Sequence, residues 1–238
     1  MDSCTRRAEL FVSALSGLID IIILIIYNLF IIVNCNIIKL NLGGSIKLEI
    51  QILHWFEALH NPITNPIMYA ITTLGNAGIF WIILAVAMLL ILPKQYKKIG
   101  LSMAIALILS LIFCNGIMKH LWARPRAFWV DGQNFVISNE FENLYGIFQS
   151  IHDYSFPSGH SSASFAAATA IFMWRKKEGT AALILATLIA LSRLYFTVHF
   201  PTDVIVGTLT GIIYGIAAYF ITKLLMKKIP AMDKIFNK

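Results

Sequence analysis

Three short segments, far apart along the chain, carry side chains suited to holding an anion and attacking it. The first contains Lys119, Arg124 and Arg126; the second is Pro157-Ser158-Gly159-His160; the third contains Ser192, Arg193, His199 and Asp203. An arginine can bind phosphate oxygens through two parallel hydrogen bonds, and a lysine acts on them as a point charge. We therefore expect Lys119, Arg126 and Arg193 to bind a phosphate group.

The second segment has the composition of a helix start that faces an anion. Pro157 and Ser158 precede a long run of small and apolar residues. The free N–H groups and the positive dipole end of a helix favour a negative ligand at such a start. Gly159 allows a ligand to approach the backbone closely, and the hydroxyl of Ser158 is expected to donate a hydrogen bond to the phosphate.

The spacing of His199 and Asp203, four residues apart, indicates a nucleophile with an orienting partner. The carboxylate would fix the tautomer of the imidazole and stabilise the positive charge that develops on attack. His160 is then available as the general acid for the leaving oxygen. Since no second carboxylate is expected near this group to hold a divalent cation, the predicted chemistry needs no metal and no other cofactor.

The elements that position these residues are expected to lie in a membrane. Of the 238 residues, 58% are hydrophobic and 13% are charged, whereas a soluble domain carries about 25% charged residues. The mean hydropathy of +0.75 excludes an ordinary soluble core, and it also excludes a disordered chain. Cys4, Cys35 and Cys114 show no CxxC or Cys/His spacing, which argues against a disulfide framework and a structural zinc.

Runs of roughly 20 apolar residues, the length that crosses a bilayer, divide the chain into six predicted spans. They cover residues 10–33, 68–92, 99–118, 158–174, 180–196 and 203–222. The amphipathic segment 48–60 predicts a short helix that lies at the interface. The expected fold is therefore all-α: one membrane domain over residues 1–238, with a six-helix transmembrane bundle.

The distribution of basic residues predicts the orientation of this bundle. All but six of the 19 Lys and Arg residues fall on one side if the spans alternate, and the six exceptions are Lys39, Lys47, Lys119, Arg124, Arg126 and Arg193. By the positive-inside rule both termini are expected to be cytoplasmic, with the three polar segments together on the opposite face. The formal charge of +7 is thus a topology signal, and no nucleic acid is expected as a partner.

The three segments together resemble the motifs of the type 2 phosphatidic acid phosphatase superfamily. The family pattern Lys-x6-Arg-Pro matches Lys119 and Arg126, although Ala127 replaces the proline. The patterns Pro-Ser-Gly-His and Ser-Arg-x5-His-x3-Asp match residues 157–160 and 192–203 in full. The resemblance covers roughly residues 60–225, the expected lipid phosphatase core. Arg124, at a different spacing from Lys119, is assigned an auxiliary place beside Arg126.

The resemblance implies attack by His199 on phosphorus, a phosphohistidine intermediate, and protonation of the leaving group by His160. The expected substrate is a phosphorylated membrane lipid, with undecaprenyl diphosphate favoured and phosphatidylglycerophosphate or phosphatidate as alternatives. A bacterial plasma membrane protein with an extracytoplasmic site is expected from the same resemblance. An anion-binding or transport protein, a haloperoxidase and a lipid phosphotransferase stay open, and the sequence leaves the oligomeric state undetermined.

Two features stand outside these motifs. Asp20 lies inside the first predicted span, where it either bonds within the bundle or lies near its inner boundary. The loop 128–156 is rich in aromatic residues and has no Lys or Arg. This composition favours an interfacial aromatic belt, and the alternative hypothesis is a lid that guides a lipid tail toward the site.

Overall fold

The computed structural model describes residues 42–130 and 153–228. The predicted span 10–33, with Asp20, lies outside the described residues, and so does most of the aromatic loop. The regular elements within the described ranges are helices: α2 (Leu42–Glu57), α3 (Thr64–Leu74), η1 (Asn76–Gly78), α4 (Ile79–Leu90), α5 (Lys94–Leu109), η2 (Ser110–Met118), α6 (Lys119–Trp122), α7 (Ala127–Val130), α9 (Gly159–Trp174), α10 (Lys176–Tyr195) and α11 (Pro201–Lys228). The all-α prediction is confirmed for this part of the chain.

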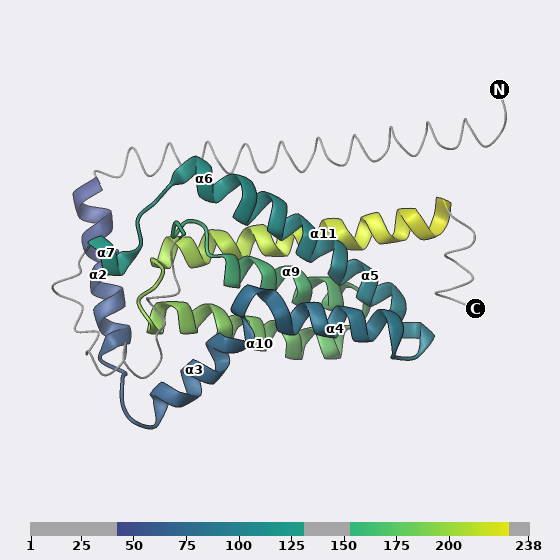
Figure 1. The fold of residues 1–238 in the computed structure, drawn as a ribbon, viewed down its shortest axis with the longest axis horizontal. Helices are drawn as coiled ribbons and strands as arrows, with labels where there is room; N and C mark the ends of the chain where they lie inside the picture. The colour runs from purple at the N-terminus through teal and green to yellow at the C-terminus, as the bar shows by residue number, and fades with distance from the viewer. Residues whose placement is uncertain (1–41, 131–152, 229–238) are drawn as a thin grey trace.

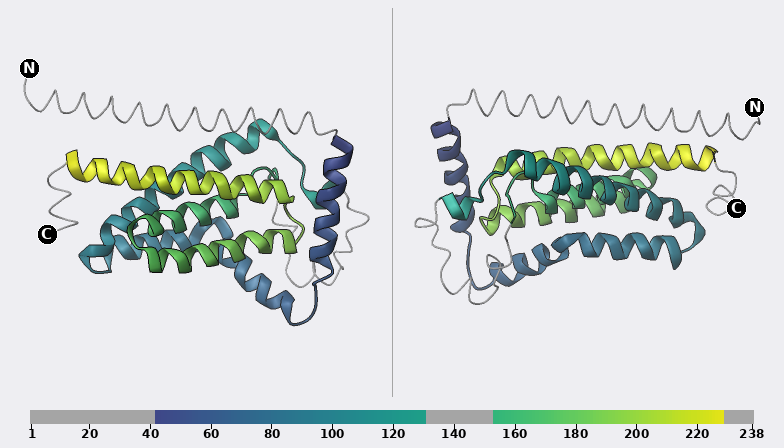
Figure 2. Two further views of the ribbon diagram at one scale, coloured as in Figure 1. Left: turned by 180° about the vertical axis from the view of Figure 1, so that it is seen from behind. Right: turned by 45° about the horizontal axis from the view of Figure 1, so that its top comes forward.

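The long helices form a bundle that a shorter helix closes at one end. Helices α4, α5, α9, α10 and α11 run roughly along one direction, and α2 crosses the end of the bundle nearly at right angles to them (Figures 1 and 2). The segment 48–60 was expected to be an interfacial helix, and α2 begins six residues earlier and ends at Glu57. Its transverse course agrees with a place at the surface of a membrane.

Three described helices are long and apolar enough to cross a bilayer: Lys94–Trp122, Lys176–Tyr195 and Pro201–Lys228. The bent pair Thr64–Leu74 and Asn76–Leu90 makes a fourth if it is counted as one span. Helix α9 coincides with another predicted span, but its 16 residues fall short of the roughly 20 that a perpendicular crossing needs. The bundle of six spans therefore stays a prediction.

The predicted span 68–92 was wrong as a single helix, because the chain breaks between Gly75 and Gly78. Ala77 and Gly78 have φ angles of 48° and 68°, which place both residues in the left-handed region that ends a right-handed helix. Helix α3 and the segment that follows it are consequently bent by 43°. The break brings Asn76 to the start of α9, where its Oδ1 lies 3.1 Å from Nε2 of His160.

Small residues allow α9 and α11 to pack closely along their length. Gly207, Gly211 and Gly215 are spaced four apart on α11, and a Cβ on any of them would lie 2.5 Å from an atom of α9 or of its N-cap residue. The facing part of α9 is buried and consists mostly of small residues, among them Ser161, Ser162, Ala166, Thr169 and Ala170, as expected for a small-residue packing surface. This contact fixes the start of α9 on the first turn of α11, where the backbone N–H of Ser158 donates to the carbonyl of Asp203 over 3.0 Å.

Candidate active site

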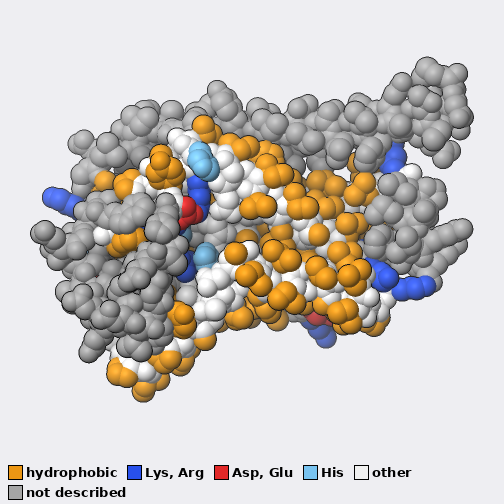
Figure 3. Space-filling model, in the orientation of Figure 1, with side chains coloured by type: hydrophobic (Ala, Val, Ile, Leu, Met, Phe, Trp, Pro, Cys, Tyr) orange, Lys and Arg blue, Asp and Glu red, His pale blue; other side chains and the backbone are white. Residues whose placement is uncertain are grey.

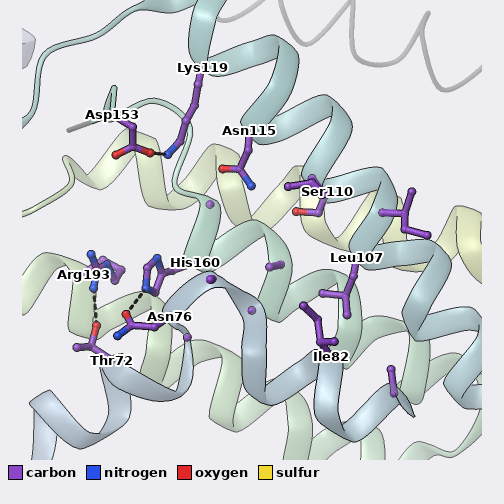
Figure 4. A pocket seen from close by; sticks show the side chains of 18 of the residues that line it. Thr72, Asn76, Ile82, Leu107, Ser110, Asn115, Lys119, Asp153, His160 and Arg193 are labelled. Atoms are coloured by element: carbon purple, nitrogen blue, oxygen red, sulfur yellow. Dashed lines mark hydrogen bonds and ion pairs between the residues drawn. The ribbon is translucent and has the colours of Figure 1, made fainter. Parts of the chain in front are cut away.

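The three segments that carry the predicted site residues meet at the end of the bundle that α2 covers. The structure places Lys119 at the start of α6, Arg126 just before α7, and Ser158 at the N-cap of α9; Arg193 lies in the last turn of α10, His199 precedes α11, and Asp203 lies in its first turn. Lys119, His160 and Arg193 approach one cavity from three different helices (Figure 4). The predicted convergence of these segments is therefore present in the fold.

The cavity has a volume of about 1170 Å³ and two chemically different regions. One region is lined by Lys119, Arg126, His160, Arg193 and His199. The other is lined by apolar side chains of α4, α5 and η2, which are Ile82, Val86, Leu89, Leu107, Ile108 and Leu111. A ligand that fills both regions must carry an anionic group and an apolar portion.

His199 is buried with its two ring nitrogens in different surroundings. Nε2 lies 3.3 Å from Nη1 of Arg126, and since a guanidinium only donates hydrogen bonds, Nε2 must present its lone pair. The proton then resides on Nδ1, which lies 3.5 Å from Oδ2 of Asp203, slightly beyond an ordinary hydrogen bond. This tautomer is the one that a nucleophilic Nε2 requires.

The electrostatic surroundings keep His199 uncharged. Burial lowers the pKa of its imidazole well below the ordinary value, and the nearby charges of Arg126, Arg193 and Lys119 lower it further. The carboxylate of Asp153 opposes this effect only in part. The imidazole is therefore neutral at pH 7, with Nε2 unprotonated.

Asp153 occupies a position between two of the cationic side chains. Its carboxylate forms ion pairs with Nζ of Lys119 and with Nη2 of Arg126, and its backbone carbonyl accepts a 3.0 Å hydrogen bond from Nε of Arg126. Partial burial alone would raise the pKa of Asp153, but the hydrogen bonds and charges of Lys119 and Arg126 hold it below its usual range. The carboxylate thus pairs with two of the cationic side chains that are predicted to bind phosphate.

Two polar residues of the broken span orient other members of the site. Thr72 on α3 accepts a 2.6 Å hydrogen bond from Nη1 of Arg193, whose buried Nε has no hydrogen-bond partner among the described residues. Asn76 bonds to His160 through Oδ1. Both contacts are visible beside the cavity (Figure 4), so the bend at residues 75–78 supports two of the predicted site residues.

Three of the predicted site residues, Ser158, Arg124 and Asp203, lie beside the cavity and do not line it. The hydroxyl of Ser158 bonds to Ser161, accepting from the backbone N–H at 3.4 Å and from Oγ at 3.0 Å, so Ser158 caps α9. Arg124 donates to Oδ1 of Asp203 over 2.7 Å and to Oε2 of Glu49 over 2.6 Å. Gly159 does line the cavity, and a Cβ there would lie 2.6 Å from Oδ1 of Asn115.

No second carboxylate was expected near this group to hold a divalent cation. The fold does bring Glu49 and Asp153 to this end of the bundle, where both pair with basic side chains. Glu49 lies in the amphipathic segment 48–60 and Asp153 in the aromatic loop 128–156, and neither belongs to a recognised motif. Sequence reasoning also missed Thr72, Asn76 and Asn115. Asn76 and Asn115 could have been recognised as polar amides inside apolar runs, because such side chains in membrane spans form hydrogen bonds to neighbouring helices.

Comparisons with known proteins agree on one family. The model of the PAP2 superfamily matches residues 95–227. The chain is 34% identical over 127 residues to YbjG of Escherichia coli (strain K12), covering 52% of this chain and 58% of that protein. It is 32% identical over 139 residues to the undecaprenyl-diphosphatase of Sulfolobus acidocaldarius, covering 58% and 62%. The chain thus matches about three fifths of the length of these relatives.

A solved structure extends the likeness over most of the chain. The transmembrane PAP2 type phosphatidylglycerolphosphate phosphatase from Bacillus subtilis superposes with a TM-score of 0.57, at 24% identity, over 84% of this chain and 94% of that one. This likeness concerns the fold.

Proposed function

Because the chain belongs to the PAP2 superfamily, we propose that it is a membrane lipid phosphatase whose best substrate is undecaprenyl diphosphate. The observation that carries the proposal is the continuous cavity of about 1170 Å³, which joins a cationic region around His199 to an apolar wall. Phosphatidylglycerophosphate and phosphatidate present the same chemistry, a phosphate on an apolar molecule. The experiment below ranks the three lipids.

The proposed reaction begins with attack of Nε2 of His199 on the terminal phosphorus. An N–P bond forms as the P–O bond to the lipid breaks, and His160 supplies a proton to the departing oxygen. Asp203 faces Nδ1 and stabilises the positive charge that the imidazole acquires. Water then attacks the phosphohistidine and gives a proton to His160, the N–P bond breaks, and inorganic phosphate leaves. Neutral His199 and protonated His160 are thereby restored.

The cationic side chains are proposed to hold the phosphoryl oxygens during both steps. Lys119, Arg126 and Arg193 line the cavity beside His199, and the start of α9 at Gly159 adds a helix N-terminus. Together these groups can stabilise the charge that spreads over the phosphoryl oxygens in the transition state. We therefore propose that hydrolysis proceeds without a divalent metal, and Asp153 must leave its two partners when a phosphate enters.

A lipid substrate is favoured over a soluble one by the apolar half of the cavity and by the surface around it. Large hydrophobic side chains of α4 that include Ile79, Ile83, Val86 and Leu90 are exposed. Figure 3 shows charged and histidine side chains gathered beside a broad hydrophobic face. We propose that this face contacts lipid, with the site on the extracytoplasmic side and both termini in the cytoplasm.

The test measures phosphate release by the purified full-length chain in detergent with excess EDTA. Undecaprenyl diphosphate, phosphatidylglycerophosphate and phosphatidate are offered to the wild type, to His199→Gln and to His120→Gln. His120 is exposed and bonds to the carbonyl of Gly116, so it serves as the matched histidine control. We expect activity that EDTA spares, that His120→Gln retains, and that His199→Gln lowers by at least about 10³-fold.

Direct detection of the intermediate separates this mechanism from its alternatives. With ³²P-labelled lipid, a rapid quench is expected to trap label on the protein that survives alkali and is lost in acid, as a phosphoramidate bond is. Turnover that persists in His199→Gln would refute the mechanism. If a folded wild type released no phosphate from any lipid while it still bound vanadate, the protein would instead be an anion-binding or transport protein.

A further inference from the structure

Helix α2 contributes a buried carboxylate to the end of the bundle that holds the site. Glu49 is 5% exposed, and it belongs to a segment that precedes the residues matched by the family model. Its Oε1 accepts from the backbone N–H and the hydroxyl of Thr202, over 3.2 Å and 2.5 Å. A buried carboxylate is costly unless it is paired, so its partners point to its role.

The partner that carries charge is Arg124, which joins Glu49 to Asp203. Nη2 of Arg124 donates to Oε2 of Glu49 over 2.6 Å, and Nη1 donates to Oδ1 of Asp203 over 2.7 Å. The guanidinium also lies 3.9 Å from the centre of the Phe200 ring, and the carbonyl of Arg124 accepts a 2.9 Å bond from the N–H of Ser155. Arg124 is therefore held from several directions.

We infer that Glu49 and Arg124 form a positioning pair that orients Asp203 and balances its charge, so that Asp203 can support His199. Oδ1 of Asp203 is committed to Arg124, while Oδ2 accepts from the N–H of Phe200 over 2.9 Å and faces His199. Arg124 alone would neutralise much of the charge of Asp203. Glu49 offsets the charge of Arg124, so the carboxylate retains its effect on the imidazole.

The other charged and titratable groups around His199 come from several elements and stay constant in the test. They are Lys119 on α6, Arg126 before α7, Asp153, His160 on α9 and Arg193 on α10. Glu49 and Arg124 act on His199 only through Asp203 and through space. Because they carry opposite charges, their removal must shift the titration of His199 in opposite directions.

The experiment compares Glu49→Gln, Arg124→Gln and the double variant, with Glu178→Gln as the control. Glu178 pairs with Arg175 at the opposite end of the bundle. Glu49→Gln leaves Arg124 uncompensated, so the acid limb of kcat/KM is expected to move to lower pH by about half a unit. Arg124→Gln should move it to higher pH by a similar amount, and the double variant and Glu178→Gln should stay near the wild type.

Positioning predicts a kinetic pattern that a merely structural role lacks. The two single variants are expected to lower kcat by roughly 10- to 100-fold with KM changed less than twofold, since neither residue lines the cavity. Glu49→Asp and Arg124→Lys keep the charges, and their acid limbs should remain at the wild-type pH. These two variants also test the positioning role through kcat if a glutamine variant fails to fold. Lower activity with an unmoved pH profile would overturn the inference.

This inference rests on the proposed function for its kinetic arm, and a second arm is independent of hydrolysis. The titration of His199 is followed by NMR in ¹³C-histidine-labelled protein, and its signal is assigned by its loss in His199→Gln. Opposite shifts in Glu49→Gln and Arg124→Gln support the pair even if no lipid is hydrolysed. Shifts in the same direction, or none, refute the pair even if the phosphatase activity is established.

Discussion

Nε2 of His199 lies 3.3 Å from Nη1 of Arg126, so an arginine contacts the atom that is proposed to attack phosphorus. The same guanidinium group donates from Nη1 to the carbonyl of Val198 over 2.9 Å. The lone pair of Nε2 therefore faces the guanidinium, and it becomes available for attack when a bound phosphate takes over this contact with Arg126. Nucleophile and anion-binding group are thus positioned by one another.

The first prediction concerns the pH dependence that follows from this contact. His199 attacks in its neutral form, which exists above its pKa, and burial with neighbouring cations holds that pKa well below the ordinary histidine value of about 6.5. The activity is therefore retained below pH 6.5 and is lost only as the pH falls through the lowered pKa. The acid limb of kcat/KM, which reports the free enzyme, measures this. An acid limb above pH 6.5 would contradict it.

The second prediction concerns Asp153, whose carboxylate pairs with Lys119 and Arg126. Asp153→Asn removes an internal competitor for these cations, so vanadate, a phosphate mimic, should inhibit the variant more strongly. The side chain of Asp153 is 53% exposed, and exposed ion pairs are weak, so we expect the inhibition constant to fall by only about 3- to 10-fold. Weaker inhibition would instead mean that Asp153 organises the two cations.

The third prediction tests whether the apolar half of the cavity accepts the lipid. Leu107 lines it on α5, opposite Ile82 on α4 (Figure 4). Leu107→Trp should raise KM for undecaprenyl diphosphate by about tenfold and leave the hydrolysis of a short, water-soluble phosphate ester unchanged. Leu209 on α11 is 46% exposed and does not line the cavity, so Leu209→Trp is the control. Equal effects of Leu107→Trp on both substrates would refute this use of the cavity.

The fourth prediction concerns the contact between α9 and α11 on which the site depends. A Cβ on Gly211 would lie 2.5 Å from the carbonyl oxygen of Ser162, whereas a Cβ on Gly116 would meet nothing closer than 3.5 Å. Gly211→Ala should therefore destabilise the protein by about 1–3 kcal/mol, the usual cost of overpacking. Gly116→Ala should leave it unchanged or slightly more stable. Thermal unfolding in detergent measures both, and equal melting temperatures would contradict the prediction.

The chemistry of the candidate site could be predicted from residue types and spacing. A histidine and a carboxylate four residues apart, and cations on the side that opposes the charge bias, need no tertiary structure to be recognised. The long apolar runs likewise predicted α9 and α10 to within four residues. They also located the helical segment Lys94–Trp122 and α11, which extend several residues beyond the predicted spans 99–118 and 203–222. Runs of this kind form helices because backbone groups inside a bilayer must be satisfied within one segment.

Only the tertiary structure decided which side chains support this chemistry. The bend at Ala77 and Gly78 aims Asn76 at His160, Asp153 reaches the cations from a loop, and Glu49 meets Arg124 across 75 residues of chain. The sequence determined the composition of the site and its membrane setting, because motif spacing and apolar length are local properties. The partners of Asp203, Arg193 and His160 depend on how distant elements pack, which local spacing does not encode.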